Sequence, residues 1–385
     1  MLCRTLVIRH GRESGIRTRI ANTDRIRLEQ YYKDLVTYLS IENASDEQWW
    51  ATWLSSRDRF LSATWNELVA LERLRHELAD SESQIVHFVA RSLAAARAAR
   101  HLAKTKGLRV ELRLHTLANL VWIETRDRAR SMARTVKVVV RTTHWIWLAR
   151  RYGPRSDTVG DCRRILVTML DATSTVGSEY SDRYFGNLHR RLEEHGVKSA
   201  YCGNLNSPPF ELLPKLWTNA GKASVGVLTF GHFLRVRDVF LTLGRLFGHR
   251  FKIAGAPTFF GIDPKFIMRR DLMEQWHAIY HAMVLRRAAK ALLDCAPNAD
   301  FVQIYENNPW ERALYAEAKK RNPPRRVLGF LHCAVLPSHF KNYIAPEEWP
   351  VRPMPTAIAC TGPAALAVLE RLGHCLLYTS DAADE

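Results

Sequence analysis

The chain has 385 residues, 47% of them hydrophobic and 25% charged, which favours a globular protein of two domains or one large elaborated domain. Lysine and arginine total 56 against 39 acidic residues, and the formal charge of +17 indicates an anionic partner such as nucleic acid, a membrane surface or a phosphorylated substrate. The sequence contains no uncharged apolar run of the ~18–20 residues that a membrane-spanning helix needs.

Cysteine usage and the ends of the chain bear on location. The seven cysteines include no CxxC pair, which argues against a disulfide framework or a zinc cluster and fits a reducing compartment. The N-terminal residues lack the apolar segment of a secretory signal, so we expect a cytoplasmic protein that can also be peripheral on the inner membrane. The tail from Cys375 to Glu385 resembles the translation of a widely used sequencing-transposon adapter. On that interpretation the natural sequence read stops at His374; a genuine short acidic tail is the alternative.

The first part of the chain has the hydrophobic spacing of helices. Apolar residues recur at helical intervals over residues 25–77, so we expect a helical N-terminal region over residues 1–80. An apolar strand at 84–89, an alanine-rich helix at 93–106 and an alternating strand at 108–114 follow in the order of a parallel α/β unit. A long helical insertion is expected over about 115–151.

The rest of the chain alternates between the two element types. Strands are expected at 164–170, 197–201, near 224–230, 300–305, 326–332 and 356–360, and helices at 187–195, 236–247, 270–293, 309–320 and 363–372. The fold class predicted is α/β, with a Rossmann-like parallel sheet over residues 81–374 and a helical N-terminal part.

The sequence lacks the motifs of several enzyme classes. The sequence contains no GxxxxGK[ST] phosphate loop, no GxGxxG after a strand, no HExxH and no Asp-x-Asp. These absences exclude several enzyme classes without favouring another, and no cofactor and no metal site is expected.

Polar residues follow two expected strands near the C-terminus. Glu306 and Asn307 come directly after the strand at 300–305, and His332 ends the strand at 326–332, one β-α unit later. Ligands of open α/β sheets bind at the carboxyl edge of the strands, where a carboxylate and an imidazole side by side can act as an acid/base pair. The alternative is structural: Glu306 and Asn307 cap a helix, and His332 is a satisfied buried histidine.

The same segment carries a family resemblance. The runs YENNPWERALY, RRVLGFLHC and PMPTAIACTGPAALAVLERLG resemble the bacterial surface carbohydrate (O-antigen) biosynthesis sugar transferases, whose pattern is Y-x-x-E-N-Q-x-W-E-K-A-L, then G-x-x-H-S, then P-x-P-D-x-x-x-x-N-G. The matching residues are Glu306, Asn307, Trp310, Glu311, Gly329, His332 and Gly362. Asn308, Cys333 and Thr361 depart from the usual Gln, Ser and Asn.

The resemblance implies a fold, a reaction and a set of site residues. Members look like metal-independent glycosyltransferases of the GT-B type, with two facing Rossmann-like domains. This chain matches the acceptor-side domain, so the resemblance implies a truncated enzyme whose donor domain is largely missing and which is inactive alone. The implied substrates are a nucleotide sugar and a saccharide or lipid-linked acceptor. Glu306 or His332 would be the catalytic base. The substrate-binding residues would be Asn307, Glu311, Asp171, Arg183 and Tyr184.

The helical insertion is strongly basic. Between Thr125 and Arg155 the sequence has Asp127 as its one acid, and the expected membrane- or anion-binding residues are Arg126, Arg130, Arg134, Lys137, Arg141, Trp145 and Trp147. The alternative is a solvated helix face whose tryptophans pack inward. No nucleic-acid-binding motif accompanies the basic residues, so no nucleic acid is expected as a partner. A non-catalytic scaffold or membrane-docking subunit of the same pathway is the alternative to an enzyme.

Overall fold

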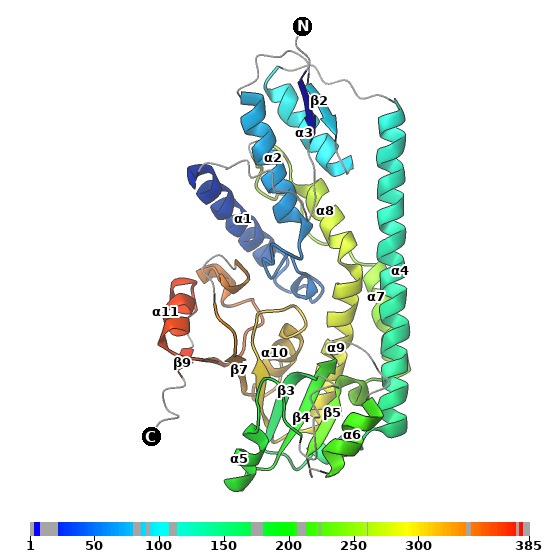
Figure 1. Cartoon of the computed structure of the whole chain (residues 1–385), viewed down its shortest axis with the longest axis vertical. Helices are drawn as coiled ribbons and strands as arrows, with labels where there is room; N and C mark the ends of the chain where they lie inside the picture. The colour runs from blue at the N-terminus through cyan, green and yellow to red at the C-terminus, as the bar shows by residue number, and fades with distance from the viewer. Residues whose placement is uncertain are drawn as a thin grey trace.

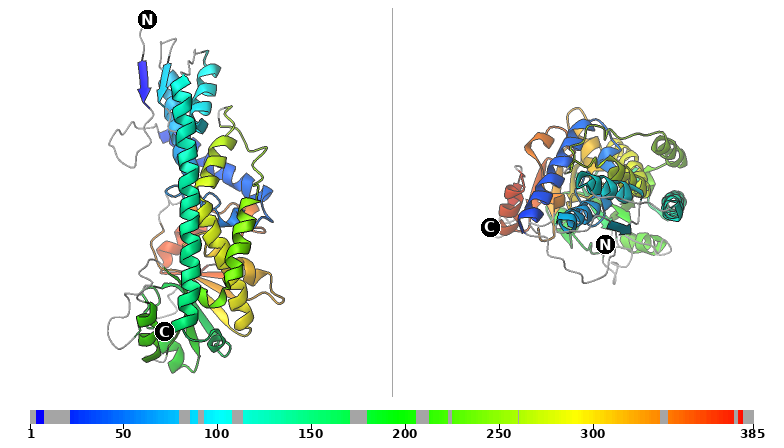
Figure 2. Two further views of the ribbon diagram at one scale, coloured as in Figure 1. Left: turned by 90° about the vertical axis from the view of Figure 1, so that its right-hand side faces the viewer. Right: turned by 90° about the horizontal axis from the view of Figure 1, so that it is seen from above.

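A long helix runs beside a stack of two bodies, one helical and one built on a parallel sheet (Figures 1 and 2). The computed structural model describes residues 4–7, 22–79, 86–89, 93–107, 114–170, 180–205, 213–222, 225–259, 261–335, 340–374 and 377–379. The long helix is α4 (Leu114–Tyr152), which matches the expected insertion to within a residue at each end.

The sheet confirms the predicted α/β class. Within the described residues it has seven strands, all parallel, in the order β5-β4-β3-β6-β7-β8-β9. The bounds are β3 (Arg164–Leu170), β4 (Ser199–Leu205), β5 (Gly226–Thr229), β6 (Asp300–Ile304), β7 (Val327–Leu331), β8 (Ala357–Cys360) and β9 (Leu377–Thr379). The last strand lies in the tail that resembles an adapter. The order runs outward from β3 in one direction and from β6 in the other, so β3 and β6 form a topological switch point, the Rossmann-like arrangement.

Helices cover this sheet and bury a continuous apolar core. Their bounds are α5 (Leu188–Glu194), α6 (Leu213–Lys222), α7 (Val236–Phe247), α9 (Trp276–Cys295), α10 (Arg312–Lys319) and α11 (Pro363–Arg371). Helix α9 contributes the largest buried face and contacts α4, α7 and α10. Its buried side chains include Leu285, Ala289 and Leu292 at intervals of four and three residues, in one core with the sheet residues.

The helical body has its own core, and residues 86–105, which were expected in the Rossmann-like domain, pack with it. It consists of α1 (Asn22–Glu42), the short 3-10 turn η1 (Trp49–Ala51), α2 (Ala63–Ala79), α3 (Leu93–Thr105) and α8 (Lys265–Glu274). Strand β2 (Val86–Val89) pairs in parallel with β1 (Arg4–Val7), not with the large sheet. Helix α3 packs Ala99 and Leu102 against this helical core, so residues 86–105 belong with the N-terminal part and not with the Rossmann-like sheet.

The helix expected over 270–293 is divided in two at Gln275. The side chain of Gln275 donates to Oδ1 of Asp271 and accepts the backbone N–H of Trp53 at 2.7 Å. Asp271 in turn accepts the backbone N–H groups of Ala63 and Thr64, the first residues of α2. These tertiary hydrogen bonds hold the chain in the break between α8 and α9. Hydrophobic spacing alone cannot predict them. No helix in the described part of the chain is both long and apolar enough to cross a membrane.

Candidate functional site

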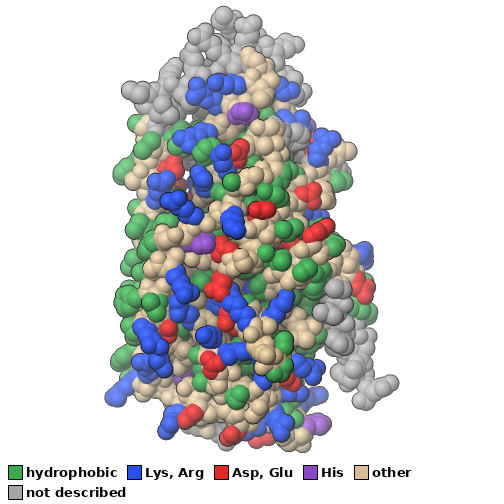
Figure 3. Space-filling view, turned by 180° about the vertical axis from the view of Figure 1, so that it is seen from behind, with side chains coloured by type: hydrophobic (Ala, Val, Ile, Leu, Met, Phe, Trp, Pro, Cys, Tyr) green, Lys and Arg blue, Asp and Glu red, His purple; other side chains and the backbone are tan. Residues whose placement is uncertain are grey.

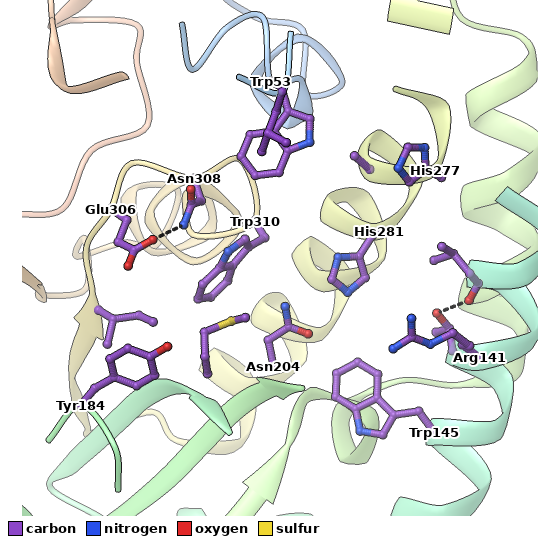
Figure 4. Close-up of a pocket in the computed structure, with 16 residues that line it drawn as sticks. Trp53, Arg141, Trp145, Tyr184, Asn204, His277, His281, Glu306, Asn308 and Trp310 are labelled. Atoms are coloured by element: carbon purple, nitrogen blue, oxygen red, sulfur yellow. Dashed lines mark hydrogen bonds between the residues drawn. The ribbon is translucent and has the colours of Figure 1, made fainter. Parts of the chain in front are cut away.

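A cavity of about 580 Å³ opens at the carboxyl ends of β3, β4 and β6, between the sheet, the helical body and α4 (Figure 4). It therefore lies at the switch point, where ligands of this sheet type bind. Trp53, Leu61, Val138, Arg141, Thr142, Trp145, Met169, Tyr184, Asn204, His277, Ala278, His281, Ile304, Glu306, Asn308 and Trp310 line it. Most of the wall is apolar or aromatic, and Glu306 is the acidic side chain among these lining residues.

Glu306 and His332 meet at this edge as the sequence predicted. Oε1 of Glu306 lies 3.2 Å from Nε2 of His332, and the two side chains are 30% and 19% exposed. The Tyr184 ring packs edge-on against the imidazole with centroids 4.6 Å apart. On the other oxygen, Asn308 donates from Nδ2 to Oε2 of Glu306 at 3.1 Å. The predicted juxtaposition is confirmed, while the roles of these residues remain predictions.

Hydrogen bonding keeps Glu306 ionised. The bond from His332 lowers the pKa of Glu306 to about 2; it outweighs burial, which acts in the opposite direction, and Asn308 and Lys341 add to the lowering. Nδ1 of His332 is buried and has no hydrogen-bond partner among the described residues. The pair therefore combines a carboxylate that faces the cavity with an imidazole whose Nδ1 makes no hydrogen bond to the described residues.

Glu311 is a fully buried carboxyl that shapes the loop carrying Glu306. Its Oε2 accepts the backbone N–H of Glu306 at 2.9 Å, and its Oε1 accepts Nδ2 of Asn308 at 2.8 Å. Burial raises the pKa of Glu311 to about 8, and the negative charge of Glu306 adds to the effect. Glu311 thus positions both neighbours without lining the cavity.

Asn307 is buried and serves the same loop from the other side. It has a positive φ of 60°, a conformation that asparagine tolerates better than most residues. Its side-chain amide donates to the carbonyl of Lys341, and its Oδ1 accepts from Nη2 of Arg312 at 3.0 Å. Its polar atoms are engaged inside the protein, so the structure places Asn307 behind the cavity wall and not at a substrate-facing position.

A buried arginine cluster behind the loop was missed by sequence reasoning. Arg312 donates to Oγ of Ser55 at 2.8 Å and so ties α10 to the helical body. Nearby, Glu348 lies 2.8 Å from Arg57 and 3.3 Å from Arg352, and all three of these charged side chains are fully buried. Isolated arginines and one glutamate, far apart in the sequence, give no local pattern that could have revealed the cluster.

The loop before α5 places Tyr184 at the cavity wall, and a second buried acid, Asp182, holds the loop in shape. Oδ1 of Asp182 accepts the backbone N–H groups of Tyr184 and Phe185, both at 2.9 Å, in the manner of an Asx turn. The short Asp-Arg-Tyr-Phe-Gly run is a signal that could have identified this turn. Arg183 is exposed and lies over the Tyr184 ring, outside the cavity lining. Asp171, also expected here, lies outside the described residues.

The basic residues of α4 divide between two faces. Arg126, Arg130, Arg134 and Lys137 are exposed along the helix, whereas Arg141 lines the cavity. Trp147 is 54% exposed. Trp145 is 4% exposed and lines the cavity, so the structure does not place it where a membrane surface could reach it. The physical reason is its position on the side of α4 that packs against the sheet core.

One group of possible metal ligands overlaps this site. Glu306, His332 and Cys333 offer one ligand atom each, all within 4.8 Å of one another. Those residue types suit zinc, but a ligating cysteine must be a thiolate. Burial raises the pKa of the Cys333 thiol, with Glu306 adding to the effect, and this disfavours the thiolate.

Comparisons with known proteins give no relative: no family model, no curated protein and no solved structure matches the chain.

Proposed function

We propose that the chain is a glycosyltransferase of bacterial surface polysaccharide (O-antigen) assembly that binds a saccharide acceptor in the switch-point cavity. The proposal draws on the family resemblance of the Glu306–Glu311 and Gly329–His332 segments. The observation that carries it is an ionised carboxylate that faces the cavity and contacts an imidazole 3.2 Å away. The acceptor would be a free or lipid-linked saccharide, and the donor a nucleotide sugar used as a substrate.

The chemistry of the pair suits activation of a hydroxyl group. The acceptor oxygen attacks the anomeric carbon of the donor, the bond from that carbon to the phosphate oxygen breaks, and the nucleotide leaves with that electron pair. Glu306 takes the hydroxyl proton, while Nε2 of His332 keeps donating its hydrogen bond to Oε1. A carboxylate with a pKa of about 2 is a weak base, so it takes the proton only as the bond to the anomeric carbon forms and the hydroxyl group becomes acidic. The products of this step are the glycoside, the free nucleotide and a protonated Glu306, which then releases its proton to solvent.

The remaining wall suits a sugar ring. Trp53, Trp310 and Tyr184 offer broad apolar surfaces with polar edges, and the side-chain amides of Asn204 and Asn308 can both donate to and accept from hydroxyl groups. Arg141 and the imidazoles of His277 and His281 lie toward α4, at the other end of the cavity (Figure 4). That end would receive a phosphate of a lipid-linked acceptor.

The test has a binding part and a reaction part. Saturation-transfer NMR would examine the wild-type chain with a panel of hexoses, N-acetylhexosamines and deoxyhexoses, and mass spectrometry would detect transfer to them from a mixture of uridine, guanosine, thymidine and cytidine nucleotide sugars. The proposal predicts saturation of at least one saccharide class by this chain, and conversion of that saccharide to a glycoside by a full-length homologue that carries the donor domain. Saccharide binding without transfer by that homologue would favour the scaffold alternative. The absence of both binding and transfer would refute the proposal.

A further inference from the structure

The outer side of α4 is an exposed apolar stripe. Trp122, Val136, Val140 and Trp147 follow one another at intervals of fourteen, four and seven residues, which keeps them on one side of a helix, and each is more than half exposed. Ala129 and Met132 lie on the same side and are also exposed. Large apolar residues in such a run are uncommon on a surface that faces only water.

Helix α7, which contacts α4, also has exposed apolar side chains. It packs beside α4, and Figure 2 (left) shows the two helices next to each other on the face turned to the viewer. Its exposed apolar side chains are Val236, Phe240, Leu241 and Phe247. We call this surface the α4–α7 face: Trp122, Ala129, Met132, Val136, Val140 and Trp147 of α4 together with these four residues of α7. In Figure 3 hydrophobic side chains gather along the edge where α4 lies, with Lys and Arg beside them.

The charge around the α4–α7 face is positive. Arg126, Arg130 and Lys137 are exposed along one border of the stripe, and Arg237 is exposed on α7. Each acidic residue of the two helices forms an ion pair with an arginine. Glu124 lies 3.0 Å from Arg128, Asp127 lies 3.2 Å from Arg270, and Asp238 lies 3.7 Å from Arg287. Asp127 is also shared with Arg126 and Arg130, so the face keeps a net positive charge.

We propose that the α4–α7 face docks on the surface of an anionic lipid bilayer. Apolar side chains enter the boundary between headgroups and acyl chains, and flanking Lys and Arg contact lipid phosphates, the arrangement of an interfacial amphipathic helix. α4 is straight and its 39 residues span about 58 Å at 1.5 Å per residue, so the face suits a planar partner.

Other occupants fit the face less well. A second copy of this chain would bring like charges together, because the basic border of one stripe would lie near that of the other. Nucleic acid would pair with the basic residues but would leave the apolar stripe in contact with its phosphates. A bilayer with anionic lipids satisfies both parts of the face.

Docking would also place the cavity beside the bilayer. Val138, Arg141, Thr142 and Trp145 on the inner side of α4 line the cavity, while the apolar stripe lies on the outer side. Only the thickness of one helix, about 10 Å, would separate the cavity from the lipid surface. This inference stands independently of the proposed sugar transfer, because it rests on the exposed sides of α4 and α7 and not on the residues of the acid/base pair.

The test is co-sedimentation of the wild-type chain with large unilamellar vesicles. One set contains phosphatidylcholine alone, and the other phosphatidylcholine and phosphatidylglycerol in a two-to-one ratio. We expect binding to the second set, at least about tenfold stronger than to the first and weakened by salt. Val136→Glu/Val140→Glu should weaken binding about tenfold or more, and Arg126→Gln/Lys137→Gln should weaken it by a similar factor.

A matched control uses two exposed isoleucines on another helix. Ile26 and Ile41 of α1 are 62% and 45% exposed, and Ile26→Glu/Ile41→Glu should leave vesicle binding unchanged. Circular dichroism and thermal unfolding verify that each variant folds. If the Val136→Glu/Val140→Glu variant does not fold, the Arg126→Gln/Lys137→Gln variant still tests the proposal. The proposal is wrong if the wild type ignores anionic vesicles, binds both vesicle sets equally, or loses binding equally in the α1 control. A dimer that Val136→Glu/Val140→Glu dissociates, without vesicle binding, would assign the face to a second copy instead.

Discussion

Glu311 is a buried carboxyl whose titration links the stability of the chain to pH. Burial raises its pKa from 4.5 to about 8, so the folded protein holds this proton more tightly than the unfolded chain does. A raised folded-state pKa gives stability that is fully present below the unfolded value and is lost as pH rises through the folded value. The free energy of unfolding therefore falls as pH rises from about 4.5 to about 8.

The magnitude follows from the size of this shift. Each pH unit in that window removes about 1.4 kcal/mol, and the whole window removes about 5 kcal/mol. Glu311→Gln replaces the carboxyl with a neutral group of nearly the same shape, which cannot titrate. The variant should therefore lack this slope, whatever its stability at a single pH.

Urea unfolding at pH 5, 6, 7 and 8 measures the slopes. Subtracting the variant from the wild type cancels the titration of other groups, such as the histidines. We expect the difference to change by about 1.4 kcal/mol per pH unit between pH 5 and 7. Glu370→Gln, at an exposed position on α11, is the matched control and should keep the wild-type slope. Parallel curves for the wild type and Glu311→Gln would refute the burial of a titrating carboxyl behind the site.

Two further changes test the contacts around the site. Glu348→Gln should lower the free energy of unfolding at pH 7 by about 3–5 kcal/mol, because it leaves Arg57 and Arg352 buried without their counter-charge; urea unfolding checks this, and a loss below about 1 kcal/mol would contradict it. His332→Ala removes the largest contribution lowering the pKa of Glu306, so that pKa should rise from about 2 toward 4.5 in a carbon-13 NMR titration. An unchanged midpoint would mean that His332 does not hold the carboxylate.

The sheet was predictable because its strands are short apolar runs bounded by turn residues. β3, β6 and β7 fall within a residue or two of their expected bounds. The partner of β2 was not predictable, because a parallel strand needs the same alternation whichever sheet it joins. The alanines of α3 fit against either body, and tertiary packing decided between them.

The site was predictable only where chain order decides position. Glu306 and His332 follow adjacent parallel strands, and such strands end at one edge of the sheet, so their contact could be foreseen. The side-chain directions of Asn307 and Trp145 depend on a positive φ and on helix rotation, and the sequence pattern specifies neither. The cluster of Arg57, Glu348 and Arg352 joins segments almost three hundred residues apart, beyond the reach of any local pattern.

The role of Glu306 as proton acceptor is tested most directly by the rate of sugar transfer in Glu306→Gln. A glutamine keeps the shape of the side chain and its contact with Asn308 but cannot take a proton. With the donor and acceptor identified by the panel, the account predicts that the change corresponding to Glu306→Gln lowers kcat of the full-length homologue about 10²–10⁴-fold, while the change corresponding to Glu370→Gln leaves the wild-type rate. A Glu306→Gln enzyme that transfers sugar as fast as the wild type would contradict it.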